Sequence, residues 1–336
     1  MRGDDLKRVG VIGAGAWGTA LACVAARAGR EVVIWAREED VVNHINQQHE
    51  NTLFLPGVTL DPRIRATEKL QDMANVDVVL MVAPAQFVGQ VSQELAKHLP
   101  KTVPVVLCAK GIEQSSGRLM TDVLAQSLPY NAVAVLSGPT FAIEAAKGMP
   151  SAVTLACADH VLGQKIVAAM AQPKFRMYLS HDLIGAEIGG AVKNVLAIAC
   201  GIVEGLKLGE NARSALITRG FAEVVRFGHA LGAETETMMG LCGLGDLILT
   251  CSSPQSRNMS LGMALAHGET LDDIMSTRRT VAEGVHTARI LHEIAIEKNI
   301  DMPICAAVNA VLHEGKALDR VIDDLLHRPV GMEYED

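Results

Sequence analysis

The chain has 336 residues, 49% of them hydrophobic and 20% charged, a balance typical of a soluble globular protein with room for two domains. A formal net charge of -8 without Lys/Arg-rich runs argues against a nucleic-acid surface but is compatible with a local basic pocket for a phosphate. The polar start runs straight into the first predicted strand and leaves no room for a signal peptide, and no apolar run reaches membrane-spanning length, so we expect no membrane insertion.

The first predicted elements enclose a glycine pattern. Residues 9–12 form a short apolar run that predicts a buried strand, and residues 19–27 predict a helix. Between them, Gly13 would make a tight turn, Gly15 would let a pyrophosphate approach the backbone, and Gly18 would let helix and strand pack closely. The N–H groups at the start of the helix would face the phosphates. We therefore predict a dinucleotide site here.

The next predicted strand, Glu31–Trp35, bears on which dinucleotide is bound. NAD sites usually place an acid about twenty residues after the glycines, whereas an arginine suits the 2′-phosphate of NADP. This chain has Arg37 at that point, which favours NADPH without excluding NADH. The alternative is a solvated charge cluster of Arg37 with Glu38 and Glu39.

The remaining elements change character along the chain. Further strands are predicted at 76–82, 103–109, 132–136, 152–156 and 175–179, with helices such as 88–98 and 118–127 between them. This alternation predicts a doubly wound parallel sheet. Later segments are helical, at 184–206, 212–230, 259–267, 282–298, 305–314 and 317–326. The sequence thus predicts an α/β fold with a dinucleotide-binding domain at 1–183 and an all-helical domain at 184–336.

Ligands of an open parallel sheet bind beyond the carboxyl ends of its strands. Lys110 follows the strand at 103–109 and could reach an anion or a substrate oxygen there, although an ordinary exposed loop lysine is the alternative. Gly138 and Thr140 follow the strand at 132–136, where a plain turn explains them equally well.

The helix at 184–206 contains an unusual lysine. Spacing of three and four places Lys193 on a face with small or apolar residues, among them Gly189 and Gly190. Burial there would lower the pKa of the amine toward neutrality, so that it could exchange a proton with an alcohol or ketone oxygen, and the small neighbours would leave room for a ligand. The alternative is a lysine that extends to the surface.

Residues 240–258 combine glycines, hydroxyls, one acid and one arginine, which predicts a poor helix and a polar pocket. Asp246 could orient a lysine, and Arg257 could bind a phosphate through its forked donors. A solvated loop between helices is the alternative.

The seven cysteines lack a C-x-x-C pair and several lie in apolar runs, which indicates reduced core thiols in a cytoplasmic protein. The eleven histidines show no pair at ligand spacing, so we expect no metal.

Together these segments resemble the bacterial NAD(P)-dependent glycerol-3-phosphate dehydrogenase family. The resemblance extends from Lys7 to about Leu326, and its motifs lie at 13–22, 109–113, 137–142, 191–195, 243–251, 256–258 and 281–284. It implies a 6-phosphogluconate dehydrogenase-like arrangement of the two domains. One departure is Met259-Ser260, where many relatives continue with arginines, so fewer positive charges would lie near the phosphate.

The resemblance also implies roles for individual residues. Lys193 would be the proton acceptor, with Lys110 and Asp246 beside it. The dinucleotide, NADP or NAD, would contact Ala16, Trp17, Arg37, Lys110, Ala142, Arg257, Val281 and Glu283. Glycerol 3-phosphate would contact Lys110, Gly138, Thr140, Asp246, Ser256, Arg257 and Asn258.

The predicted activity is reversible hydride transfer between NAD(P)(H) and a small phosphorylated three-carbon substrate, interconverting glycerol 3-phosphate and dihydroxyacetone phosphate for phospholipid synthesis. Relatives are commonly homodimers. Two alternatives stay open: a related dehydrogenase of a hydroxy acid or ketopantoate, and a module that senses NAD(P)H without turnover.

Overall fold

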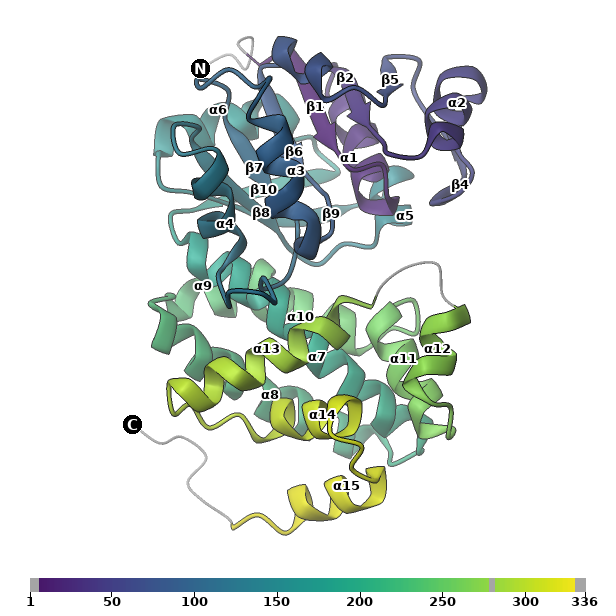
Figure 1. Ribbon diagram of the computed structural model, residues 1–336, viewed down its shortest axis with the longest axis vertical. Helices are drawn as coiled ribbons and strands as arrows, with labels where there is room; N and C mark the ends of the chain where they lie inside the picture. Colours follow the sequence, from purple (N-terminus) through teal and green to yellow (C-terminus); the bar gives the residue numbers. More distant parts are fainter. Residues whose placement is uncertain (1–5, 278–281, 330–336) are drawn as a thin grey trace.

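An eight-stranded sheet forms the N-terminal part of the computed structural model, which describes residues 6–277 and 282–329, and a bundle of helices lies against it (Figure 1). The strand order is β10-β9-β8-β7-β6-β1-β2-β5. The strands are β1 (Arg8–Ile12), β2 (Glu31–Trp35), β5 (Ile64–Thr67), β6 (Val78–Met81), β7 (Val105–Leu107), β8 (Val133–Ser137), β9 (Ser151–Cys157) and β10 (Phe175–Ser180).

The predicted doubly wound parallel sheet is confirmed with one exception, since β8 and β9 run antiparallel while the other neighbouring pairs of this sheet are parallel. The connection between β8 and β9 contains only the five-residue helix α5 (Ala142–Ala146). A helix of that length spans about 7 Å, too little to carry the chain back along a strand for a parallel crossover.

Helices cover both faces of the sheet. Apolar side chains of β1 alternate between the faces, so Val9 and Val11 join one core and Ile12 joins the other. The first core is shared with α1 (Ala16–Arg27), α2 (Glu39–Gln48), α5 and α6 (His160–Met170), and the second with α3 (Val88–Leu95) and α4 (Met120–Ser127). This is the doubly wound arrangement that the sequence predicts.

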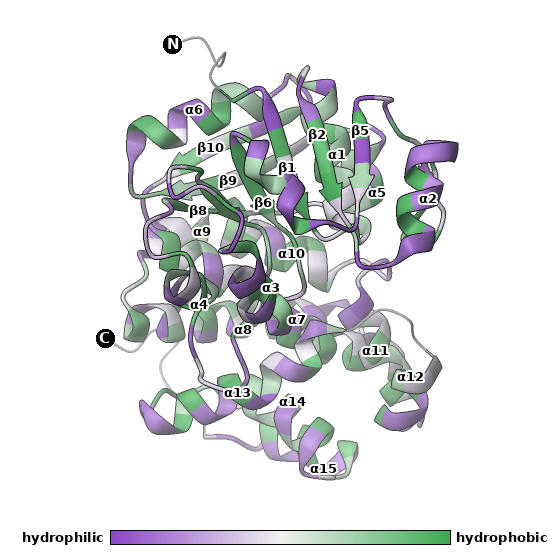
Figure 2. Ribbon diagram, turned by 45° about the horizontal axis from the view of Figure 1, so that its top comes forward, coloured by the Kyte–Doolittle hydropathy of each residue, from purple (hydrophilic) through white to green (hydrophobic). Residues whose placement is uncertain are grey.

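A small hairpin of β3 (Glu50–Asn51) and β4 (Leu55–Thr59) lies outside the main sheet. The sequence analysis did not identify it, nor did it identify β5, α2, α5, α6, α9 (Thr235–Met239), α10 (Asp246–Cys251) and α12 (Leu271–Thr277). The outer helix α2 mixes hydrophilic and hydrophobic residues (Figure 2), and only Val41 and Ile45 of it are buried.

The C-terminal part is helical, as predicted, and is built around α7 (Leu183–Gly205). Its other predicted helices are α8 (Glu210–Leu231), α11 (Arg257–Ala266), α13 (Glu283–Glu297), α14 (Pro303–His313) and α15 (Leu318–Leu326), with ends shifted by at most one turn. By length and composition α7 could cross a membrane, contrary to the expectation from sequence, but 94% of its most apolar stretch is buried. It is therefore the core helix of this part.

Two helices of this core approach each other closely. A Cβ at Gly201 of α7 would lie 2.0 Å from the backbone oxygen of Met259, and one at Gly262 of α11 would lie 2.0 Å from that of Ile198. Neither position tolerates a side chain, and the two backbones therefore meet directly. This contact places the first two turns of α11 beside the C-terminal third of α7.

The cysteines agree with the sequence prediction in one respect. All seven are free thiols and all are buried.

Candidate active site

Lys193 lies at the centre of the site, on the middle of α7, with only 7% of its surface exposed. Its Nζ donates hydrogen bonds to Oδ1 of Asp246 at 2.7 Å and to Oγ1 of Thr250 at 2.8 Å. The alternative of a lysine that extends to the surface is therefore wrong.

The environment of Lys193 tunes its amine. Burial is the largest cause that lowers the pKa of Lys193, the Asp246 carboxylate opposes it, and the neighbouring Lys110 ammonium adds to it, so that the pKa lies at about 8. An amine with a pKa this close to neutrality is suited to giving or taking a proton.

Asp246 connects two lysines from different parts of the fold. Its Oδ2 accepts a hydrogen bond from Nζ of Lys110 at 2.6 Å, and Lys110 Nζ also lies 3.3 Å from the backbone oxygen of Gly138. Lys110 follows β7 and Gly138 follows β8, so the carboxyl ends of two strands meet the helical part at this carboxylate. Lys110 is only 19% exposed in its side chain and is not an ordinary surface lysine.

The segment around Asp246 is helical, which corrects the prediction of a poor helix and of a solvated loop. Residues Leu241–Gly245 form one turn of π-helix that continues into α10. Because Asp246 and Thr250 lie four residues apart on this helix, they share the face that meets Lys193. Sequence reasoning missed Thr250 because the helix itself was not recognised.

The space that we expected beside Lys193 is occupied by the protein. A Cβ at Gly189 would lie 2.5 Å from the backbone oxygen of Cys242, and one at Gly190 would lie 3.2 Å from Cγ of Lys110. Because these glycines have no side chain, the turn before α10 and the aliphatic part of the Lys110 side chain can pack directly against α7. The small residues on this face of α7 are therefore explained by packing.

The glycine turn between β1 and α1 has the predicted geometry. Gly13 has a φ of 110°, and a Cβ at Gly18 would lie 1.9 Å from the backbone oxygen of Gly13, which confirms the tight turn and the close packing. A Cβ at Gly15, by contrast, would have no atom of the described residues within 4 Å. A pyrophosphate can approach the backbone at Gly15.

Three buried polar atoms near the strand ends fit a bound dinucleotide and substrate. Trp17 Nε1, Ser137 Oγ and Thr140 Oγ1 are buried and have no hydrogen-bond partner among the described residues. Trp17 stands in the first turn of α1, and the other two follow or end β8. Buried polar groups without partners are unusual, and a ligand with several hydrogen-bonding groups would satisfy them.

The remaining predicted cofactor residues come from several elements of both parts of the fold. Arg37 follows β2, is 78% exposed in its side chain and lies 3.6 Å from Glu38. Ala16 begins α1 and Ala142 begins α5. Val281 lies outside the described residues. Glu283 begins α13, and burial raises the pKa of its carboxyl while the cations of Arg257, Lys110 and Lys193 oppose the shift.

The start of α11 carries three residues expected to contact glycerol 3-phosphate. Ser256 caps the helix by accepting a hydrogen bond from Met259 N at 3.2 Å, and the exposed Arg257 is its first residue. The side chain of Asn258 is engaged within the protein, since its Nδ2 donates to Oδ1 of Asn194 at 2.9 Å and its Oδ1 accepts from Gly284 N at 3.1 Å. Asn194, which sequence reasoning did not single out, thus joins α7 to the starts of α11 and α13.

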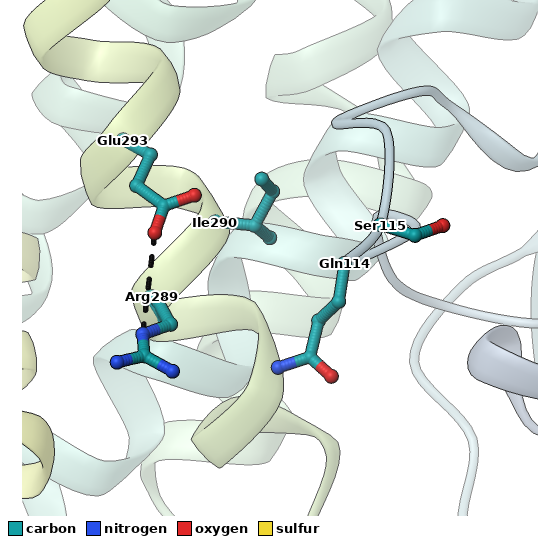
Figure 3. A pocket seen from close by; sticks show the side chains of 5 residues that line it. All are labelled: Gln114, Ser115, Arg289, Ile290 and Glu293. Atoms are coloured by element: carbon teal, nitrogen blue, oxygen red, sulfur yellow. Dashed lines mark ion pairs between the residues drawn. The ribbon is translucent and has the colours of Figure 1, made fainter.

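A separate cavity of about 390 Å³ lies between the loop after Lys110 and α13 (Figure 3). Gln114 and Ser115 line it from the loop, and Arg289, Ile290 and Glu293 line it from the helix. Arg289 and Glu293 face each other at 4.0 Å and are exposed, so this cavity is distinct from the buried lysines.

Comparisons with known proteins agree with this geometry. Residues 8–162 match the model for the N-terminus of NAD-dependent glycerol-3-phosphate dehydrogenase, and residues 182–323 match the model for its C-terminus. The glycerol-3-phosphate dehydrogenase [NAD(P)+] of Parvibaculum lavamentivorans is 56% identical, over 97% of this chain and 98% of that protein.

Solved structures give the same result. The crystal structure of glycerol-3-phosphate dehydrogenase from Coxiella burnetii has a TM-score of 0.92 at 36% identity and covers 96% of this chain and 99% of that one. A ketopantoate reductase from Ralstonia eutropha, at 16% identity over 95% of this chain and 100% of that one and a TM-score of 0.59, shares the fold alone. This chain therefore belongs to the NAD-dependent glycerol-3-phosphate dehydrogenase family.

Proposed function

We propose that this protein interconverts dihydroxyacetone phosphate and sn-glycerol 3-phosphate with NAD(P)(H), through Lys193 as the group that exchanges a proton with the substrate. The observation that carries this proposal is the buried arrangement of Lys193, Asp246 and Thr250 with Lys110. A non-catalytic sensor of NAD(P)H would have no use for an amine held in this way.

In the reductive direction, Lys193 Nζ donates a proton to the oxygen on C2 of dihydroxyacetone phosphate. Asp246 and Thr250 hold Nζ in place, and Lys110 offers its ammonium to the negative charge that develops on the same oxygen. The bound dinucleotide supplies the hydride. General acid catalysis of this kind contributes roughly a hundred- to ten-thousand-fold to the rate.

The start of α11 supports the assignment of a phosphorylated substrate. Helix starts favour anions because their N–H groups and dipole face the ligand, and Arg257 adds a forked donor there. Ser256 and Asn258 then serve mainly by shaping this helix start, since their side chains bind within the protein. Gly138 and Thr140 form the opposite wall after β8.

The dinucleotide would lie along the carboxyl edge of the sheet, with its pyrophosphate at Gly13, Gly15 and Gly18. Ala16, Trp17, Lys110, Ala142, Arg257, Val281 and Glu283 would complete its contacts. Arg37 would bind the adenosine end, where its exposed guanidinium suits the 2′-phosphate of NADPH.

The deciding experiment follows the absorbance of NADPH after addition of dihydroxyacetone phosphate to the purified protein. Oxidation of NADPH is expected, with ketopantoate and unphosphorylated dihydroxyacetone as poor substrates. If NADPH binds but no substrate oxidises it, the protein is a sensing module. Equal turnover with ketopantoate would instead assign the other dehydrogenase.

Further features belong to the same proposal. We infer a homodimer in the cytoplasm that supplies glycerol 3-phosphate for phospholipid synthesis, with functional units at 1–183 and 184–336. Leu206 and Leu208, 36% and 48% exposed between α7 and α8, are apolar side chains suited to an interface, and the buried free cysteines suit a reducing compartment. Sedimentation of the purified protein and cell fractionation test these two points.

A further inference from the structure

Asn51 of the small hairpin forms hydrogen bonds to the glycine turn and to the first helix. Its side chain is fully buried, and its Nδ2 donates to the backbone oxygen of Ala14 and to Oγ1 of Thr19, each at 2.8 Å. Its Oδ1 accepts from Phe54 N at 3.1 Å within the hairpin. Both amide protons are thus used on the turn and its helix, which lie 37 and 32 residues away in sequence.

The bond to Ala14 has a consequence for the next peptide group. The peptide between Ala14 and Gly15 is trans and planar, so the oxygen of Ala14 and the N–H of Gly15 point in opposite directions. Because Asn51 holds the oxygen on the protein side, the N–H is directed to the other side. The backbone at Gly15 is also open on its Cβ side, where an added Cβ would have no described neighbour within 4 Å.

Without this bond, the Ala14–Gly15 peptide could rotate and present its carbonyl oxygen to the ligand. A carbonyl oxygen repels a pyrophosphate, whereas an N–H attracts it. Thr19 gives only partial support, since its Oγ1 lies 3.4 Å from the oxygen of Ala14 and is itself held by Asn51.

We propose that Asn51 is a positioning residue for the dinucleotide, which fixes the Ala14 carbonyl so that the N–H of Gly15 faces the pyrophosphate. This inference rests on the proposed cofactor site and extends it to a residue that does not touch the cofactor. The hairpin of β3 and β4 thereby becomes part of the cofactor site.

The test measures equilibrium binding of NADPH by calorimetry in three variants. Asn51→Ala is expected to raise the Kd roughly tenfold or more, since it removes the bond to Ala14 and leaves that oxygen buried. Asn51→Asp is expected to raise the Kd further, because a carboxylate cannot donate to the oxygen and repels it. Thr19→Val, which keeps the bond between Asn51 and Ala14, should raise it by only about two- to fivefold.

A matched control is Asn131→Ala. Asn131 is also a buried asparagine whose Nδ2 donates to two backbone oxygens, those of Pro100 at 2.9 Å and Val103 at 2.8 Å, but it lies at the amino edge of the sheet. We expect a comparable loss of thermal stability and an unchanged Kd for NADPH.

Steady-state kinetics separate a positioning role from a general loss of structure. The Asn51 variants should show a raised KM for NADPH with kcat and the KM for dihydroxyacetone phosphate near normal. A native Kd in Asn51→Ala and Thr19→Val, or an equal rise in Asn131→Ala, would overturn the inference. If Asn51→Ala does not fold, Asn51→Asp, which removes the donor to Ala14 but keeps the acceptor for Phe54 N, decides alone, and a native Kd there overturns the inference. A wild-type protein that binds NADPH but does not turn over would refute the proposed activity without affecting this inference.

Discussion

Oδ1 of Asp246 lies 2.7 Å from Nζ of Lys193, although 53 residues separate them in sequence. The other oxygen of the same carboxylate binds Lys110, so one anion lies between two cations. Each ammonium group thus has a carboxylate oxygen of its own, while the cluster as a whole carries one positive charge when both lysines are protonated.

Removing the amine should abolish most of the activity. For Lys193→Ala we expect kcat to fall about a hundred- to ten-thousand-fold, because the variant loses the amine that exchanges the proton in the proposed mechanism. The Kd for NADPH should change little. Single-turnover oxidation of NADPH measures the rate, and near-normal turnover would remove Lys193 from the mechanism.

The pH profile should report the state of Lys193. Burial sets its pKa to about 8, so reduction of the ketone, which needs the ammonium form, should decline above about pH 8, while oxidation of glycerol 3-phosphate should rise through the same range. Asp246→Asn removes the charge that raises the pKa of Lys193 and should move both limbs to lower pH. A profile of kcat/KM from pH 6 to 10 checks this. Unmoved limbs in the variant would contradict it.

Two buried glutamates should make stability depend on pH. Glu187 accepts hydrogen bonds from N and Oγ1 of Thr121, Glu223 accepts from N of Ile304 and Cys305, and burial raises the pKa of each carboxyl to about 7. The native state then holds protons that the unfolded state releases above about pH 4.5, so unfolding free energy is highest below that pH and falls as the pH rises to about 7.

Each shift corresponds to at most about 3 kcal/mol. Thermal melts at pH 5 and pH 8 should therefore differ less in Glu187→Gln and Glu223→Gln than in the wild type. Glu94→Gln, a change in an exposed ion pair with Lys97, serves as the control and should leave the difference unaltered. A wild-type melting temperature that rises from pH 5 to pH 8 would count against this account.

Two substitutions in the glycine turn should separate its role in packing from its role in ligand binding. Gly15→Ala should fold with a native melting temperature, because its backbone is extended and its Cβ meets no described atom within 4 Å, yet its methyl group should weaken NADPH binding. Gly18→Ala should lose roughly 1–3 kcal/mol of stability or more, because its Cβ would overlap the oxygen of Gly13. Melting curves with and without NADPH distinguish the two. Equal stability of both variants would show that the turn is not packed in this way.

Local patterns were sufficient to predict the glycine turn, most strands and the long helices. In strands and helices, burial places apolar residues at regular intervals within the sequence of the element itself. The burial of Lys193 could be predicted for the same reason. By contrast, the residues that hold Lys193 depend on partners far along the chain. Thr250 becomes informative only when Leu241–Cys251 is known to be helical, and Gly243 and Gly245 in that segment disguise the helix.

Two further features of the fold were not predicted because they also depend on residues far apart in the sequence. The antiparallel pairing of β8 and β9, which are joined through the five-residue helix α5, is not visible in the residues of either strand. The hairpin at Asn51 was missed because Leu55–Thr59 contains Pro56 and Gly57, which are poor strand formers. The hairpin is held by the burial of Leu55 and Val58 in the first core and by the bonds of Asn51 to Ala14 and Thr19.

The apolar helix α7 also has a consequence for protein synthesis. Its sequence leaves the ribosome before α11, α13 and α14, the helices that later cover it. Until those segments are made, the nascent chain carries a stretch hydrophobic enough to aggregate or to be taken for a membrane anchor. A version shortened before residue 257 should therefore collect in inclusion bodies.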